Sequence, residues 1–255
     1  MPAEPRPAAT VVLVKPTPGG LEVFLLRRAG TVGFFPHAWV FPGGRVEESD
    51  GQVSVSGEVR GLATELASFG VAALRECLEE CGVWLGQGQP APELRARLNA
   101  RGATLLDAPE PGVDLSRLRY WAWWITPEAE PKRYNTRFFL AIVQAEEIAH
   151  AAHDDHETVS SVWIRPAEAL ARAEQGDFFL APPTWLTLLE LSHFDDVEAL
   201  ERAAATRDVR PILPRLDLEE GVSVVLPGDP SYPSEAPASP LARRLTSTGG
   251  GWSAG

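Results

Sequence analysis

Residues 75–83 read Arg-Glu-Cys-Leu-Glu-Glu-Cys-Gly-Val, and this stretch decides how the whole chain is interpreted. Around it, apolar residues recur at spacings of three and four over residues 62–81, which predicts an amphipathic helix that ends at the following glycine. On such a helix Glu76 lies one turn from both Glu79 and Glu80, so three carboxylates share one stripe. At about 6 Å and an effective dielectric constant of about 20, each like-charged pair costs about 2–3 kcal/mol. The stripe is therefore stable only where it faces water or holds cations.

The cation that suits this stripe is Mg²⁺ or Mn²⁺, because carboxylate oxygens are hard ligands that these ions prefer. A bare E-x-x-E-E pattern is more often a solvated helix face, and this is the alternative interpretation. The surroundings favour a metal site: Arg75 precedes the stripe, Gly82 follows it, and a Phe-Pro-Gly-Gly loop lies upstream at residues 41–44. We therefore expect the three glutamates to hold a divalent cation.

The composition excludes several classes of protein. Among 255 residues, 35 are Asp or Glu and 23 are Lys or Arg, which gives a formal net charge of −12. This field disfavours nucleic acid as a partner and means that a bound anion needs local neutralisation. No apolar run approaches the roughly 18 residues needed to cross a bilayer, and residues 1–10 have three prolines but no apolar core of a secretory signal. We therefore expect a cytoplasmic protein with no membrane partner, and a homodimer is left open.

The two cysteines and the histidine-rich stretch are assigned no chemistry. Cys77 and Cys81 cannot form a disulfide framework, and their spacing places both on the buried side of the predicted helix. His150, His153 and His156 are spaced three residues apart, but they lack the cysteine partners of structural zinc sites. We interpret the cysteines as small core residues and the histidine-rich stretch as a polar loop.

The opening stretch resembles the signature of the Nudix (MutT-like) hydrolases, G-x5-E-x7-R-E-U-x-E-E-x-G-U, in which U is a bulky apolar residue. Residues 75–83 match its second half when Cys77 takes the first apolar position. The first half begins at Gly44, but Asp50 stands where the family has Glu. Between Asp50 and Arg75 lie 24 residues where the pattern has seven, which implies an insertion of 17 residues.

The insertion falls within residues 51–73, between the glycine loop and the helix. It leaves open which acidic residue supports Arg75, whether Asp50, Glu65 or neither. The interrupted signature also leaves open a second function, in which a Nudix-like sensor binds a nucleotide without hydrolysing it. An interaction module built on the insertion or on the C-terminal tail is a third hypothesis. The retained glutamates favour an enzyme.

Other motifs resemble the branch of this family that is related to the peroxisomal coenzyme A diphosphatase, and the likeness extends over residues 9–233. These motifs are Trp124-Ile-Thr-Pro127, Asn135-Thr-Arg-Phe-Phe-Leu-Ala141, His156-Glu157-Thr-Val159 and Leu226-Pro-Gly-Asp-Pro230. The extra motif of other coenzyme A diphosphatases has a histidine six residues before the Phe of F-P-G-G. That position is Phe35 here, so this extra motif is not met.

For the fold, the resemblance implies an α/β protein, a Nudix-type α/β/α sandwich with a mixed sheet. We expect the Nudix domain to span residues 8–227, including the insertion at 51–73 and a C-terminal helical extension at 183–226. Residues 228–255 are rich in Pro, Ser and Gly, which predicts a disordered tail.

For the activity, the resemblance implies divalent-metal-dependent hydrolysis of the pyrophosphate of a nucleoside diphosphate linked to another group. The metal ligands that it implies are Glu76, Glu79, Glu80, the backbone carbonyl of Gly44 and the distant Glu157. The resemblance implies that cations held there would bridge pyrophosphate oxygens and lower the pKa of water, and we expect one of the helix glutamates to serve as the general base.

Arginines near the expected site are candidates for substrate binding, because guanidinium groups suit bidentate contacts with phosphate. They are Arg27, Arg28, Arg133 and Arg137, with Lys132 beside them. The substrate that we expect is a soluble small molecule, coenzyme A or an acyl derivative of it. ADP-ribose and dinucleotides such as NADH are left open, because the fold and the signature fix the reaction and not the leaving group.

Overall fold

The computed structural model describes residues 2–31, 35–57, 59, 67–88, 90–108, 113–219, 221–233, 241–249 and 251–255. The strands of its central sheet are β1 (Arg6–Thr17), β2 (Gly20–Arg28), β3 (Trp39–Val40), β4 (Gly43–Arg45), β7 (Arg119–Ile125), β8 (Tyr134–Ile142), β9 (Thr158–Ile164) and β10 (Pro211–Ile212). They follow the order β10-β7-β8-β1-β2-β3, with β4 paired to β1 and β9 paired to β2. The pairs β1–β8 and β7–β10 are parallel and the others are antiparallel, so the sheet is mixed, as predicted.

The central strand β1 has apolar side chains on both faces. Ala9, Val11 and Leu13 belong to one buried core, whereas Val12 and Val14 belong to a second core on the opposite face. This is the period of two that a strand imposes on its side chains. Because both faces of the sheet are apolar, the fold requires a layer of helices on each side.

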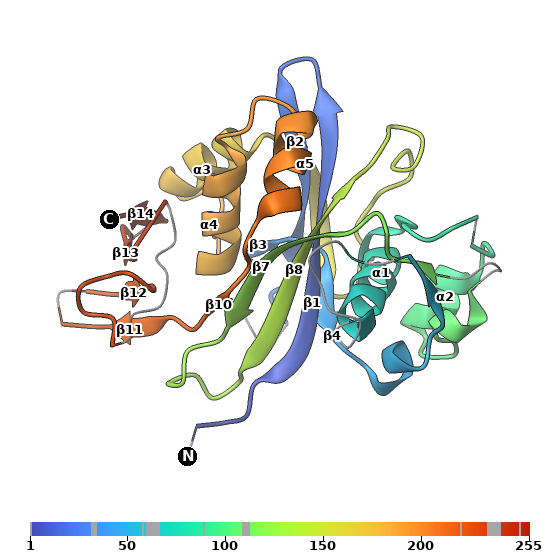
Figure 1. The fold of residues 1–255 in the computed structure, drawn as a ribbon, viewed down its shortest axis with the longest axis horizontal. Helices are drawn as coiled ribbons and strands as arrows, with labels where there is room; N and C mark the ends of the chain where they lie inside the picture. Colours follow the sequence, from blue (N-terminus) through green and yellow to red (C-terminus); the bar gives the residue numbers. More distant parts are fainter. Residues whose placement is uncertain are drawn as a thin grey trace.

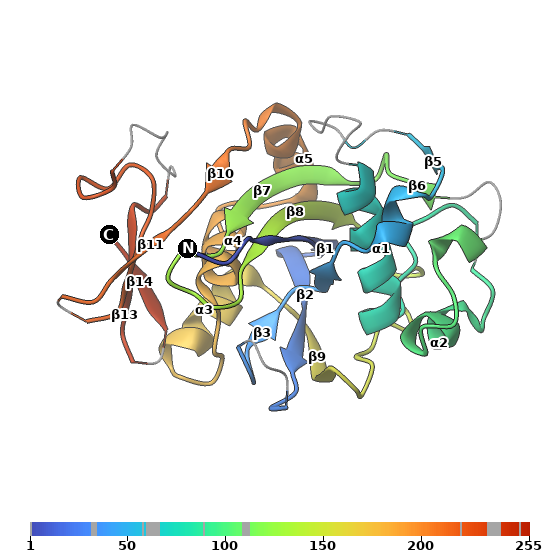
Figure 2. The same ribbon diagram turned by 90° about the horizontal axis from the view of Figure 1, so that it is seen from below.

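Among the described residues, five α-helices supply these layers. They are α1 (Ala67–Cys81), α2 (Leu94–Asn99), α3 (Pro166–Glu174), α4 (Pro182–Leu191) and α5 (Val197–Thr206). Two views show α1 and α2 on one side of the sheet and α3, α4 and α5 on the other (Figures 1 and 2). This arrangement confirms the predicted α/β/α sandwich. Among the described residues, no helix combines the length and the apolar character needed to cross a bilayer.

The helix α1 buries its apolar side against β1. Cys77 and Cys81 lie on this side with no exposed surface, as predicted, and their sulfur atoms are 3.6 Å apart. The Sγ of Cys81 also contacts the carbonyl oxygen of Cys77 at 2.9 Å. With the apolar side packed on the sheet, the glutamates of α1 are left to face its edge near β4.

The predicted insertion at residues 51–73 lies partly within the described residues, and Glu65 falls outside them. A short 3-10 helix, η1 (Glu48–Gly51), follows the glycine loop. After it, β5 (Val55–Ser56) pairs in parallel with β6 (Val113–Asp114). The chain before α1 is thereby tied to the chain that follows α2.

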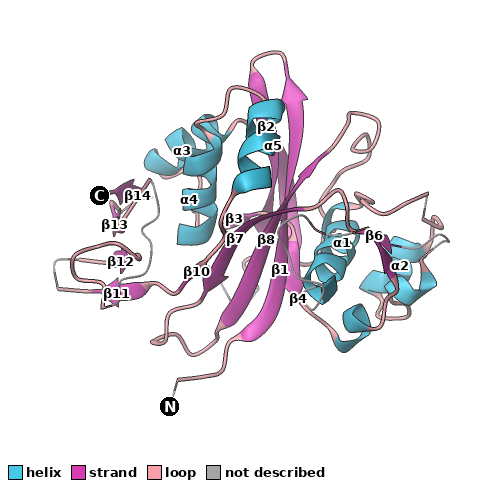
Figure 3. Ribbon diagram, viewed as in Figure 1, coloured by secondary structure: helices cyan, strands magenta, loops and turns pink. Residues whose placement is uncertain are grey.

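The C-terminal region differs from its prediction. The expected helical extension at 183–226 contains α4 and α5 but continues into strands. These strands, β11 (Arg215–Asp217), β12 (Ser223–Val225), β13 (Arg244–Ser247) and β14 (Trp252–Ala254), form a small antiparallel sheet (Figure 3). The described part of residues 228–255 therefore holds two strands where the composition predicts disorder.

A few single residues explain this order. Leu245 is fully buried in the core that also contains α3 and α4, and the indole nitrogen of Trp252 donates a hydrogen bond to the carbonyl oxygen of Leu180 at 2.9 Å. Arg244 forms ion pairs with Asp217 at 2.6 Å and Asp229 at 3.1 Å. The composition of the segment does not reveal these few anchoring residues, because the many Pro, Ser and Gly residues between them dominate the average.

Candidate active site

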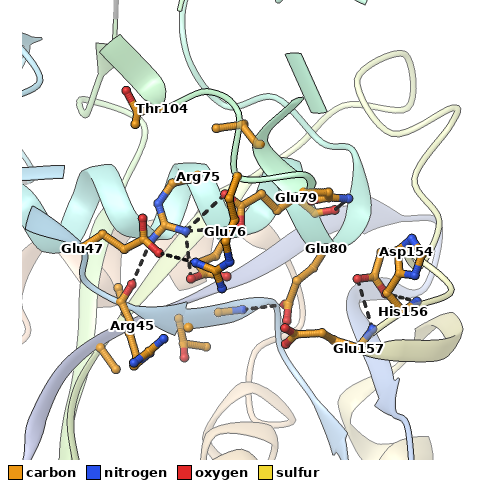
Figure 4. A pocket seen from close by; sticks show the side chains of 18 of the residues that line it. Arg45, Glu47, Arg75, Glu76, Glu79, Glu80, Thr104, Asp154, His156 and Glu157 are labelled. Carbon is orange, nitrogen blue, oxygen red and sulfur yellow. Dashed lines mark hydrogen bonds and ion pairs between the residues drawn. The ribbon is translucent and has the colours of Figure 1, made fainter. Parts of the chain in front are cut away.

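One cavity of about 460 Å³ lies between α1, the strands β4 and β1, and the loop that leads into β9. Glu76, Glu79 and Glu80 line it from α1, Gly44 from β4 and Glu157 from the loop (Figure 4). These segments are far apart in the sequence, and the sandwich brings them together. All five residues that were predicted as metal ligands therefore border a single cavity.

Arg75 is the buried centre of the site. Its Nε donates to Oδ1 of Asp50 at 2.9 Å, and its Nη2 donates to Oδ2 of Asp50 at 3.1 Å and to the carbonyl oxygen of Arg45 at 2.8 Å. The Nη1 atom donates to Glu76 at 3.0 Å and to Glu79 at 3.3 Å. Asp50 is thus the acidic residue that supports Arg75, and Arg75 in turn orients two carboxylates of α1.

The turn η1 delivers Asp50 to this position. The Oδ2 atom of Asp50 accepts the backbone N–H of Glu47 at 2.7 Å, so the carboxylate closes its own turn while it binds Arg75. Burial lowers the pKa of Arg75, but its hydrogen bonds to Asp50 and the charges of the neighbouring carboxylates outweigh burial and raise the pKa. The guanidinium therefore stays charged.

Burial raises the pKa of each α1 glutamate. The pKa of Glu76 rises to about 7, because desolvation outweighs the attraction of Arg75. Glu80 accepts the backbone N–H of Gly43 at 2.9 Å, and burial together with the charge of Glu76 raises its pKa well above the ordinary value. Desolvation likewise raises the pKa of Glu79. Buried charges of one sign are costly, and a cation among them would offset that cost.

The donor atoms of the cavity fit a hard divalent cation. They are carboxylate oxygens and a backbone carbonyl, which are the ligands that Mg²⁺ and Mn²⁺ prefer. A Cβ atom on Gly44 would lie 2.3 Å from Oε1 of Glu76, so the absence of a side chain lets the carboxylate approach the loop backbone. Within the described ranges, no three acidic, histidine or cysteine side chains are close enough to hold an ion as they stand. A cation has to compete with Arg75 for the oxygens of Glu76 and Glu79.

Asp154 shapes the loop that carries Glu157. Its carboxylate accepts the backbone N–H groups of His156 at 3.1 Å, Glu157 at 3.3 Å and Thr158 at 2.9 Å. Burial raises the pKa of Asp154, but these hydrogen bonds and that of the Thr158 hydroxyl outweigh burial and lower it. The Glu157 side chain then points toward Glu80 across the cavity (Figure 4).

The C-terminal end of α1 is joined to the same loop. The backbone N–H of Ala152 donates to the carbonyl oxygen of Cys81 at 3.1 Å. From α2, the Nε of Arg95 donates to the carbonyl of Glu79 at 3.1 Å, and its Nη2 donates to the carbonyls of Glu80 at 3.2 Å and Ala152 at 3.1 Å. A helix leaves its last carbonyls without partners, so these donors both satisfy the helix end and fix the loop to it.

Of the four arginines predicted to bind substrate, only Arg28 lines the cavity. Its Nε is buried and has no hydrogen-bond partner in the described part of the chain. Arg133 lies elsewhere: it donates to the carbonyls of Thr126 at 3.0 Å and Ala3 at 2.7 Å, and it lines a separate cavity with Lys132.

Arg27 and Arg137 also lie outside the cavity. Arg27 is exposed on β2, beside a register shift in its pairing with β9. The guanidinium of Arg137 is buried, 3.6 Å from the centre of the Trp123 ring and 4.9 Å from that of Phe69. Cation–π contacts of this kind hold an arginine inside the fold. Nearness to a strand end in the sequence was therefore a poor guide to which arginines reach the site.

Several residues that line the cavity were missed by the sequence analysis. They are Arg45, Glu47, Asn99, Arg101, Thr104, Asp154 and His156. Those around the end of α2 carry no motif, and only the fold brings them to the glutamates. The polar run that contains Asp154 was interpreted as the loop that carries Glu157, but no role was assigned to Asp154 or His156 themselves.

An α/β/α sandwich with a carboxylate-bearing helix packed over a mixed sheet and a glycine loop beside it defines a Nudix hydrolase, an enzyme that hydrolyses pyrophosphate bonds. The model of the NUDT19 Nudix domain matches residues 54–191, which is more than half of the chain, and the chain belongs to this family.

Individual proteins agree with this assignment. The chain is 27% identical to acyl-coenzyme A diphosphatase NUDT19 of Gallus gallus, over 90% of this chain and 80% of that protein. It is 24% identical to the Homo sapiens protein of the same name, over 89% of this chain and 76% of that protein. A crystal structure of a Nudix hydrolase from Alicyclobacillus acidocaldarius superposes with a TM-score of 0.72 and 28% identity, over 82% of this chain and 99% of that one. The resemblance to the Nudix hydrolases and to their coenzyme A diphosphatase branch is confirmed.

Proposed function

We propose that this protein hydrolyses the pyrophosphate of coenzyme A or an acyl-coenzyme A, with Mg²⁺ or Mn²⁺ as its cofactor. The observation that carries the proposal is the single cavity bordered by the α1 glutamates, Gly44 and Glu157. The chain is similar over most of its length to acyl-coenzyme A diphosphatases, which supports the choice of substrate. The residues that would hold the cation are Glu76, Glu79, Glu80, Glu157 and the carbonyl of Gly44.

Once bound by these residues, a divalent cation would supply positive charge to offset that of the pyrophosphate and would lower the pKa of the attacking water. The chain supplies the remaining parts. Arg28 lines the cavity, and its buried Nε has no hydrogen-bond partner among the described residues, which suits this guanidinium to hold a phosphate oxygen. Arg75 keeps Glu76 and Glu79 oriented through its hydrogen bonds.

Proton transfer is assigned to a glutamate of α1. A general base works best when its pKa lies near the working pH, and burial raises the pKa of these carboxylates toward neutrality. Glu76 and Glu80 are buried most deeply and Glu79 least. We propose that one of the three accepts the proton of the attacking water. The activities of the single Glu→Gln variants identify which one.

A panel of substrates tests the proposal. The parent protein is incubated with coenzyme A, acetyl-coenzyme A, ADP-ribose and NADH in the presence of Mg²⁺ or Mn²⁺, and the products are separated by chromatography. We expect adenosine 3′,5′-bisphosphate and a phosphopantetheine product, with the highest kcat/KM for a coenzyme A compound. A higher kcat/KM for ADP-ribose or NADH would overturn the substrate assignment. Tight binding without any product would favour the nucleotide sensor instead.

We also propose that residues 8–227 act as the Nudix domain and that the protein works in the cytoplasm. Sedimentation of the purified chain distinguishes a monomer from a homodimer, and fractionation of cells tests the location.

A further inference from the structure

The helix α2 ends in an unusual way. The backbone N–H of Arg101 donates to the carbonyl of Leu98 and that of Gly102 donates to the carbonyl of Arg97, both at 2.8 Å. These two bonds form a Schellman motif, which requires a left-handed residue directly after the helix cap. Arg101 takes that place with a φ of 54°. Glycine is the residue that adopts this conformation without strain, and here it stands one position later.

The contacts of the Arg101 side chain within the protein do not offset the free-energy cost of this strain. Its Nη1 contacts Oε1 of Glu47 at 3.3 Å, but the two side chains are 74% and 39% exposed. Exposed ion pairs contribute little to stability. What the strained backbone does achieve is to bring Arg101 to the wall of the cavity, which Arg45 and Thr104 also line. A non-glycine residue held at such a position is a sign of function.

The charges around the cavity are unequal on its two sides. Glu47, Arg45 and Thr104 lie on one side, and Asp154, His156 and Glu157 lie on the other (Figure 4). Arg101 lies on the same side as Glu47, because the two form an ion pair. In the described part of the chain Arg45 has no ion pair, so Glu47 is the single carboxylate that pairs with either Arg45 or Arg101. A chain with a net charge of −12 needs such a local excess of positive charge to hold an anion.

We propose that Arg101 is a substrate-binding residue that exchanges Glu47 for a phosphate group of the substrate. The planar guanidinium donates two parallel hydrogen bonds to phosphate oxygens, which a carboxylate partner at 3.3 Å with one contact does not fully use. The proposal rests on the function proposed above. The phosphate belongs either to the scissile pyrophosphate or to a further phosphate ester on the ribose, and the experiment below distinguishes the two.

The test uses Arg101→Gly and Arg101→Asn, because both residues tolerate the left-handed conformation. We expect KM for coenzyme A to rise by about 10-fold or more, which is the loss of one charged hydrogen-bonding group. The melting temperature of Arg101→Gly should stay the same or rise by about 2 °C, since backbone strain is removed. Loss of substrate affinity without loss of stability is a result that a merely structural arginine would not give.

The matched control is Arg97→Ala. Arg97 lies in the last turn of α2 and forms an exposed ion pair with Asp107, but it does not line the cavity. Its substitution should leave KM within about twofold of the parent. A KM for Arg101→Gly within the same limits, on every substrate that the parent turns over, would overturn the proposal.

A comparison of coenzyme A with 3′-dephospho-coenzyme A identifies the phosphate. If Arg101 binds the ribose phosphate, Arg101→Gly raises KM for coenzyme A alone; if it binds the pyrophosphate, KM rises equally for both compounds. Should the parent prefer ADP-ribose, the proposed substrate fails, and the same comparison of KM on ADP-ribose still decides the role of Arg101. In the absence of turnover, calorimetric titration with coenzyme A gives the decision, because coenzyme A carries both phosphate groups: an unchanged Kd in Arg101→Gly overturns the proposal.

Discussion

Arg75 and Asp50 are joined by two hydrogen bonds, at 2.9 and 3.1 Å, although they lie 25 residues apart in the chain. Their side chains are 3% and 1% exposed. The pair bridges the inserted segment and fixes η1 to the middle of α1. The same guanidinium then orients Glu76 and Glu79, so the geometry of the site depends on one buried charge.

The substitution Asp50→Asn should destabilise the protein by about 3–5 kcal/mol, because it leaves the Arg75 charge buried without its main partner. Urea unfolding followed by circular dichroism measures the free energy of unfolding. Asp208→Asn is the matched control, since Asp208 forms an exposed ion pair with Arg210 and its loss should cost about 1 kcal/mol or less. Equal effects of the two substitutions would contradict the importance of the buried pair.

The substitutions Glu79→Gln and Glu80→Gln should each lower kcat/KM by about 100-fold or more, since each removes a charge that the cation needs. Glutamine keeps an acceptor for the N–H of Gly43, so Glu80→Gln retains that backbone contact. Glu174→Gln, on the exposed surface of α3, should have the activity of the parent. Parent-like rates in both site variants would show that the assignment of the α1 carboxylates is wrong.

The substitution Arg95→Met should weaken Mn²⁺ binding by about 10-fold, because it frees the Glu157 loop from the end of α1. The signal of free Mn²⁺ in electron paramagnetic resonance measures this affinity without substrate. The amide of Ala152 should also exchange its hydrogen faster in the metal-free variant. Arg97→Met serves as the control on the same helix, and Arg95→Lys should restore part of the affinity. An unchanged Mn²⁺ affinity in Arg95→Met would rule out this link.

The small C-terminal sheet should loosen in strong acid. Burial alone would raise the pKa of Asp229, but hydrogen bonds from Ser231 and Arg244 outweigh it and lower the pKa from 3.8 to about 2. A carboxylate whose pKa is lower in the folded than in the unfolded chain stabilises the fold at every pH above its unfolded-state pKa. This stabilisation is lost as the pH falls through the folded-state pKa of about 2. The indole N–H signal of Trp252 in NMR spectra, assigned with Trp252→Phe, should therefore shift between pH 4 and pH 2. In Asp229→Asn that shift should be smaller.

The sequence was sufficient for the parts of the site that obey short-range rules. The spacing of Glu76, Glu79 and Glu80 on a helix predicts a shared face, and the resemblance of that stretch predicts both the sandwich and the class of reaction. The partner of Arg75 was undecided, because 24 residues separate it from Asp50 and no sequence periodicity measures the distance across an insertion. Only the folded chain shows that η1 brings Asp50 to it.

The wall of the cavity and the C-terminal sheet could not be predicted for a related reason. Arg101 and Arg95 reach the site through the packing of α2 against α1, a contact that carries no signature in either segment. The strands of the tail depend on Leu245 and Trp252 finding sites on a distant core. Arg137 was misplaced because its neighbours in space, Trp123 and Phe69, are remote in the sequence.

The two thiols of α1 make the opening of this helix observable without any label. Cys77 and Cys81 are the only cysteines of the chain, and both are sealed between the helix and the sheet. An alkylating reagent reaches them only when α1 has detached from the sheet, so the rate of modification in native buffer measures how often this local opening occurs. Slower modification in the presence of Mg²⁺ or nucleotide would measure how much each ligand stabilises the packing of α1 on the sheet.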